Sequence, residues 1–338
     1  MSHLLRLTMV RWGAGMGQFR TILCVAVAVM PSGAGLAKPP VDAPPRYRLT
    51  RLPMETATVL NDRGQVAGHN WSGEGILYTP GKKPRSLGHV PSHPPGRAGL
   101  VPEYLSNDGA VYGYSTWVTS GAITSGETVH FRWNKNKMME TDSECSPSRF
   151  RNRRGEYAYT AARGEFERQP DDSVRYDEWM AVLQHGDGTK TELGTLGGKS
   201  SHVNAINADG KIVGWSEVQA GSGRGFLYSG GTMRPLSLVP GTPDLPSIGT
   251  TANAINDLGE IVGHQTARDA KKVHQIAVLW DRDGKAHDLN TLVTPPLRTS
   301  RSLYAAVAIN ARGQIIGQGS DGAFLLTPVP PKRAKKRP

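Results

Sequence analysis

The densest group of residues able to do acid–base chemistry is the segment 160–179, TAARGEFERQPDDSVRYDEW, which holds six carboxylates. Two carboxylates at a suitable separation can act as the acid and the base of glycoside cleavage. The spacing here selects no pair, and Arg163, Arg168 and Arg175 lie between the acids. The segment therefore favours a solvated charged loop, with a polysaccharide hydrolase or lyase as the alternative.

Other chemistry-bearing residues are sparse. His89 and His93 are four residues apart in HVPSH, but they lie in a proline-rich loop and lack the glutamate of the H-E-x-x-H zinc motif. Cys145 has no nearby histidine to activate it. We therefore predict no catalytic residue, no metal ligand and no cofactor.

A set of polar and aromatic side chains recurs at one position of an internal repeat, directly after a glycine in segments such as IVGW and IVGH. Its members are His69, Tyr114, Trp215, His264 and Gln318, with Thr160 in a degraded copy. One interpretation is a ring of groups that binds a ligand such as a glycan, for which tryptophan and tyrosine provide stacking faces. The other is packing between repeat units.

The repeat itself is clearest in NAINDLGEIVG, residues 253–263. Related copies begin at 58, 204 and 307, and weaker ones at 103 and 148. Each joins two short apolar segments through N-x-x-G or a close variant, in which asparagine bonds its own backbone and glycine accepts positive φ. The pattern predicts six β-hairpins; the 40 glycines and 24 prolines and the lack of any sustained helical period argue against helical bundles.

Third and fourth strands follow each hairpin, for example GFLYSG (225–230) and AHDLNTL (286–292). Four antiparallel strands at a period near 50 residues are typical of a propeller blade, so we predict a six-bladed, all-β propeller. The last unit lacks a fourth strand, whereas YRLTRLP (47–53) precedes the first unit where a fourth strand belongs. We expect this N-terminal strand to close the last blade; an open β-solenoid is the alternative.

LGTLGGKSSHVNAINADGKIVGWS (193–216) and the following GFLYSGGTMRPL resemble the HAF repeat of bacterial probable extracellular repeat proteins. The resemblance covers about residues 47–328 and is degraded in the second and third units. The third-strand motif reads RGF, IAV and GAF instead of HAF. The resemblance implies secretion and a propeller-like β fold, and it brings no catalytic residues.

The first 37 residues have the pattern of a secretory signal: Arg6, Arg11 and Arg20, then the apolar run TILCVAVAVM (21–30) and small residues before Ala37. A membrane anchor is the alternative. We divide the rest into a linker (38–46), the repeat domain (47–328) and a basic tail (329–338). The net charge is +11, of which the signal carries +3 and PPKRAKKRP carries +5, leaving +3 for residues 38–329.

These observations predict an exported, monomeric, non-catalytic protein, periplasmic or secreted, with no transmembrane segment after signal cleavage. In a propeller, the links between strands two and three and between blades share one face. Here we expect the long loops there: 89–100, 114–128, 160–179 and 240–251. Function usually lies on such loops. The expected partner is a carbohydrate or another cell-envelope polymer, and not nucleic acid.

Overall fold

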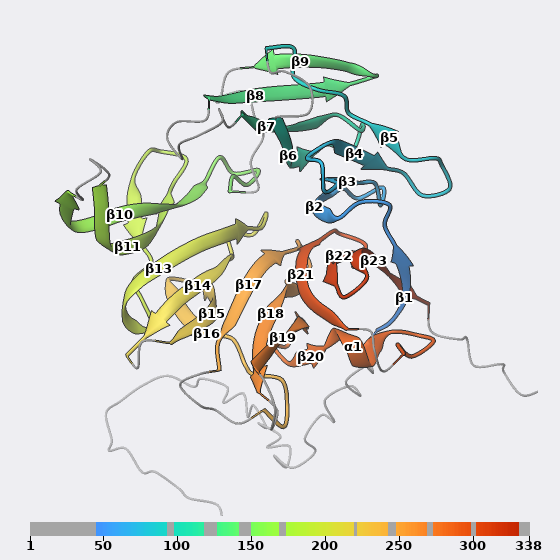
Figure 1. The fold of residues 1–338 in the computed structure, drawn as a ribbon. Helices are drawn as coiled ribbons and strands as arrows, with labels where there is room; N and C mark the ends of the chain where they lie inside the picture. The colour runs from blue at the N-terminus through green and yellow to red at the C-terminus, as the bar shows by residue number, and fades with distance from the viewer. Residues whose placement is uncertain are drawn as a thin grey trace, which may run out of the picture. The chain divides into compact units, whose positions relative to one another are not determined.

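The computed structural model describes residues 45–92, 98–117, 127–141, 150–168, 174–219, 222–242, 248–268, 273–298 and 302–330. Its strands form six antiparallel sheets that follow one another in sequence order (Figure 1). We call them blades one to six. None of the helices in the described part of the chain is long and apolar enough to cross a membrane.

The strands of the first three blades fall where the hairpin repeat places them. Blade one contains β2 (Thr56–Leu60), β3 (Val66–His69), β4 (Gly75–Tyr78) and β5 (Arg85–Ser86). Blade two contains β6 (Ala98–Leu105), β7 (Val111–Trp117), β8 (Glu127–Asn134) and β9 (Lys137–Thr141). Blade three contains β10 (Tyr157–Arg168), β11 (Val174–Gln184) and β12 (Lys190–Glu192). Its copy of the repeat begins at 148; residues 148 and 149 lie outside the described residues, and Arg151 forms an isolated antiparallel bridge with Tyr157.

The last three blades are regular. Blade four contains β13 (Gly197–Ile206), β14 (Ile212–Val218), β15 (Gly223–Ser229) and β16 (Thr232–Pro235). Blade five contains β17 (Thr250–Ile255), β18 (Ile261–Arg268), β19 (Val273–Trp280) and β20 (Ala286–Asp288). Blade six contains β21 (Leu303–Ile309), β22 (Ile315–Gly319), β23 (Gly322–Val329) and β1 (Arg46–Arg51).

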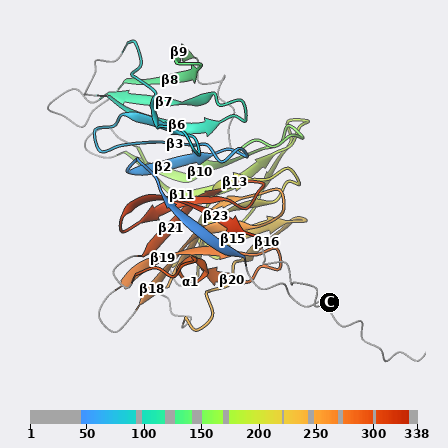
Figure 2. The same cartoon turned by 90° about the vertical axis from the view of Figure 1, so that its right-hand side faces the viewer.

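The N-terminal strand closes the last blade, as predicted. β1 pairs antiparallel with β23, from Arg46 opposite Val329 to Arg51 opposite Phe324. In both views the blue β1 lies beside the red β23 (Figures 1 and 2). Tyr47 of β1 is only 2% exposed and packs in the core that blades five and six share. The six-bladed β-propeller, with its permuted strand, is therefore the fold.

The hydrophobic core is divided among the interfaces between neighbouring blades. In the cluster between blades four and five, Val213 and Ile261 of the second strands pack with Trp280 of the third strand of blade five. Comparable clusters lie between blades one and two, three and four, five and six, and six and one. Each of these interfaces buries apolar faces of two neighbouring blades, which explains why one repeat alone could not fold.

Each N-x-x-G segment forms the tight turn that the sequence predicted. In blade five, the Asn256 side-chain oxygen accepts hydrogen bonds from the backbone amides of Leu258 (3.1 Å) and Glu260 (2.9 Å). Gly259 has φ +85° and its amide donates to the Asn256 carbonyl at 3.0 Å. Only glycine adopts this backbone conformation without strain, so the turn fixes the hairpin register.

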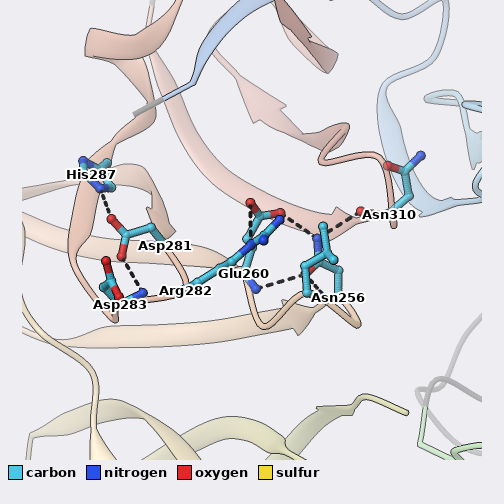
Figure 3. A network of polar contacts seen from close by, with 8 residues as sticks. Asn256, Glu260, Asp281, Arg282, Asp283, His287 and Asn310 are labelled. Carbon is cyan, nitrogen blue, oxygen red and sulfur yellow. Dashed lines mark hydrogen bonds and ion pairs between the residues drawn. The ribbon is translucent and has the colours of Figure 1, made fainter. Parts of the chain in front are cut away.

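The same asparagines also connect one blade to the next. The side-chain amide of Asn256 donates to the carbonyl of Asn310 in blade six at 3.1 Å (Figure 3), and that of Asn207 donates to the carbonyl of Asn256 at 3.1 Å. Asn310 in turn donates to the carbonyl of Asn61 in blade one at 2.9 Å. These asparagine bridges therefore join the end of the repeat array to its beginning, independently of β1.

The two kinds of tight turn share one face, as expected. Arg282, in the turn between β19 and β20, lies 3.8 Å from a carboxylate oxygen of Glu260, beside the turn between β17 and β18 (Figure 3). His287, on β20, donates to Asp281 of the same turn at 2.7 Å. Burial alone would raise the pKa of Asp281, but this hydrogen bond and backbone amides lower it below its ordinary value. We call this surface the tight-turn face.

The prediction of a long loop over 160–179 was wrong. β10 and β11 extend through most of it, with the described residues interrupted only at 169–173. The two strands stay paired up to Arg168 opposite Val174, with one register shift between Arg163 and Phe166. A smaller difference is in AHDLNTL, where β20 stops at Asp288 and α1 (Leu289–Leu292) makes one helical turn.

Candidate functional site

Three aromatic rings from two blades form a continuous group on the half of the sheets away from the tight turns. Trp179 of β11 lies in blade three, and His202 of β13 and Trp215 of β14 lie in blade four. The ring centroids of Trp179 and His202 are 6.0 Å apart, and those of His202 and Trp215 are 5.5 Å apart. We call these residues the aromatic row.

The backbone holds the row in place. His202 and Trp215 are direct cross-strand partners of the β13–β14 pair, so their side chains lie on the same face of the sheet. The backbone amide of Trp179 donates to the hydroxyl of Ser200 at 3.1 Å, which ties β11 to the start of the next blade. The neighbouring amide of Ala181 makes the same bond to Ser201 at 3.0 Å.

Gly223 makes room for the Trp215 indole. A Cβ atom at this position would lie 1.6 Å from Nε1 of Trp215, so no side chain fits while the indole stays where it is. The indole thus lies directly against the backbone of β15, which restricts its rotation. A ring fixed in this way can contact a ligand with little loss of side-chain entropy.

The row has the properties of a binding surface. Trp179 is 37% exposed, and His202 and Trp215 are half-buried. Burial lowers the pKa of His202 below its ordinary value of 6.5, so the imidazole is neutral at pH 7 and can both donate and accept a hydrogen bond. Two indole faces beside a neutral imidazole suit a ligand with apolar faces and hydroxyl groups.

The predicted ring of ligand-binding residues occupies equivalent places in five blades. His69, Tyr114, Trp215, His264 and Gln318 lie on the second strands, opposite Thr56, Val101, His202, Thr251 and Ala305. Their contacts within the described residues run to their own or a neighbouring blade, and none joins two of the five. The prediction that they bind a ligand together stays a prediction.

Two residues at this position contribute to packing between blades. The Gln318 side-chain amide donates to the carbonyl of Glu55 in blade one at 2.8 Å. The hydroxyl of Thr160 accepts from the amide of Val203 in blade four at 3.0 Å. In both cases the partner lies in the following blade.

The other members have local partners. Tyr114 packs edge-on against His130 with centroids 6.4 Å apart, and Nδ1 of His69 lies 3.3 Å from the Asn70 carbonyl. Burial lowers the pKa of His264, whose buried Nδ1 has no hydrogen-bond partner among the described residues. Trp215 differs because its contacts extend through His202 to another blade.

Sequence reasoning missed Trp179 and His202. Counting from the turn at Asn207–Gly210 would place Val203 opposite Trp215, but a β-bulge between Val203 and Ala205 shifts the register and brings His202 there instead. Trp179 ends the segment 160–179, for which the sequence predicts a loop. Its contact with His202 depends on how blades three and four pack against each other. A pattern within one repeat carries no information on that contact.

The remaining candidates add no second site. His93 and Cys145 lie outside the described residues. Within the part that is described, no three histidine, cysteine or acidic side chains come together as metal ligands do. Of the acids in 160–179, Glu178 is the cross-strand partner of Arg163, whose guanidinium lies 3.3 Å from Glu192.

The topology defines the chain as a six-bladed β-propeller closed by its N-terminal strand. No family model and no curated protein sequence matches it. Among solved structures, it is similar to a gluconolactonase from Xanthomonas campestris, with a TM-score of 0.41, 11% identity and coverage of 89% of this chain and 99% of that one. It is also similar to the six-bladed Aleuria aurantia lectin, with a TM-score of 0.34, 10% identity and coverage of 86% and 98%.

Proposed function

We propose that this chain is an exported, monomeric, non-catalytic propeller of the HAF-repeat kind, which binds a carbohydrate of the cell envelope or the extracellular medium. The observation that carries the proposal is the aromatic row of Trp179, His202 and Trp215. Sugar rings present C–H faces that stack on indoles, and their hydroxyl groups bond to a neutral imidazole. Restricted rings on rigid strands lower the entropic cost of such binding.

A binding role suits the row better than catalysis. A glycosidase needs two carboxylates about 5–10 Å apart on either side of the scissile bond. Of the described acids beside the row, Glu178 is the cross-strand partner of Arg163, and Glu217, two residues beyond Trp215 on β14, accepts the backbone amide of Lys199 at 2.9 Å. The row supplies the faces of two indole rings and one imidazole. These groups do not form the pair of carboxylates that glycoside cleavage requires.

The binding proposal predicts that Trp179→Ala weakens carbohydrate affinity by about tenfold or more, because the variant removes one stacking face from the centre of the site. A glycan array probed with the full chain selects the sugar, and calorimetry then compares the variants. Trp215→Ala should have a similar effect. Trp71→Ala is the matched control, since Trp71 is 87% exposed on the β3–β4 turn of blade one, in a different part of the chain.

Equal weakening by Trp71→Ala would contradict this assignment, as would an array that binds no glycan. Melting curves of each variant distinguish a lost site from a lost fold. Trp179→Ala is the safer variant for this purpose because its side chain is the most exposed of the row.

Export is a separate part of the proposal. We expect the mature chain to begin near Lys38 and to be found in the periplasm or the medium, because the apolar run 21–30 and Ala37 fit signal cleavage. N-terminal sequencing of the protein from these fractions, with light scattering for the monomer, checks this. Exported material that still begins at Met1 or Met16 would disprove cleavage after Ala37.

A further inference from the structure

A small hollow opens on blade six, at the end opposite the tight turns. Leu49 and Arg51 of β1 form one wall, and Leu303 and Phe324 form the floor. The short β22–β23 turn, residues 319–322, forms the other wall. The hollow belongs to a different blade from the aromatic row and needs none of its residues.

The strand pairing explains why these side chains converge. Arg51 is the direct partner of Phe324, and Leu49 lies two residues earlier on the same face of β1. Phe324 is 2% exposed and Leu303 is 4% exposed, so the floor is part of the core that blades five and six share. The hollow is thus an opening of that core toward solvent.

A glycine keeps the hollow open. A Cβ atom at Gly319 would lie 2.9 Å from the carbonyl oxygen of Ser302 and 3.3 Å from Leu303. The walls beside it are held by two hydrogen bonds: the Ser320 amide donates to the Ser302 carbonyl at 2.8 Å, and the Ser302 amide donates to the Ser320 hydroxyl at 3.1 Å. The cavity is therefore preformed.

The rim carries a guanidinium above an apolar floor. Arg51 is exposed, and within the described part of the chain it has no ion-pair or hydrogen-bond partner for its side chain. Asp321 also lines the hollow, and this residue already has a polar interaction partner. A guanidinium beside an aromatic and aliphatic floor suits a ligand that has a carboxylate at one end and a compact apolar body.

We propose that this hollow binds a small amphiphilic carboxylate, whose apolar body contacts Phe324 and Leu303 and whose carboxylate pairs with Arg51. Such a ligand bridges β1 and the rest of blade six. Binding is therefore coupled to the closing strand, and it raises the melting temperature by binding only the closed fold. This inference is independent of the proposed carbohydrate site.

The test uses the full chain with phenylacetate as the probe and calorimetry as the measurement. We expect millimolar or tighter binding, a higher melting temperature, and binding of the uncharged 2-phenylethanol that is weaker by about tenfold or more. Arg51→Gln should lose affinity for phenylacetate by a similar factor. Arg48→Gln is the matched control, because Arg48 is also exposed on β1 but alternates to the opposite face.

Three results would overturn the proposal. The first is no binding of phenylacetate in the millimolar range. The second is equal affinity for 2-phenylethanol, a comparison on the unaltered chain that does not depend on the folding of any variant. The third is an equal loss in Arg48→Gln, which would show a general effect of positive charge.

Discussion

A chain that lacks residues 38–53 is expected to lose cooperative folding altogether and to aggregate. The deletion removes β1, whose partner β23 would become an exposed sheet edge at the other end of the sequence. It also removes the buried side chains of Tyr47 and Leu52, each worth about 1.5–3 kcal/mol of burial. Together with the lost strand pairing, this approaches the total stability of about 5–15 kcal/mol that is usual for a domain.

Thermal unfolding and light scattering measure this effect. Two point variants distinguish the contribution of the buried side chain from that of the strand pairing. Tyr47→Ala should lower the melting temperature strongly. Arg48→Ala, at an exposed neighbouring position, should leave the melting temperature nearly unchanged. A truncated chain that stays monomeric and melts as the full chain does would show that closure by β1 is dispensable.

The second large effect is expected at Asn256, where Ala should lower the free energy of unfolding by about 3 kcal/mol or more. The side chain accepts two backbone amides of its own turn and donates to Glu260 and to the carbonyl of Asn310. Alanine removes all four hydrogen bonds at a position that is 5% exposed, and it leaves the amides of Leu258 and Glu260 without their acceptor. Each buried group left unsatisfied costs about 1–3 kcal/mol. Chemical denaturation measures the change.

Asn70→Ala is the matched control, because Asn70 accepts the amides of Ser72 and Glu74 in the same way but lies in an exposed turn. Asn256→Ser should fall between the two variants. Blade two already has serine at this position: the Ser106 hydroxyl accepts the Ala110 amide, and its carbonyl accepts Asn61 from blade one. Equal losses for Asn70→Ala and Asn256→Ala would show that the asparagine bridges between blades add nothing.

The fold was predictable because its determinants are local and repeated. The asparagine and glycine of each turn define a hairpin, and six hairpins with one displaced strand define the closed propeller. The side chain of Asn256 also serves a second purpose, the bond to Asn310, that its position in the turn does not reveal. Contacts between blades depend on packing, and sequence spacing alone does not specify them.

The candidate site was only partly predictable for the same reason. Trp215 was identified because it recurs at a fixed place in the repeat, but its partner Trp179 comes from another blade. The charged composition of 160–179 hid the alternation that extends β10 and β11. The composition predicts a loop there. In the structure, backbone pairing between β10 and β11 continues through most of the segment and makes it a hairpin.

The pairing of β1 with β23 also sets an order of events during synthesis. Of the described strands, β1 is made first, and its only strand partner is the one made last. Blades one to five can form from contiguous segments while the chain is still growing, but blade six cannot be completed until Val329 has been added. β1 therefore stays unpaired while the strands between it and β23 are made, and the ring can close only after β23 has been synthesised.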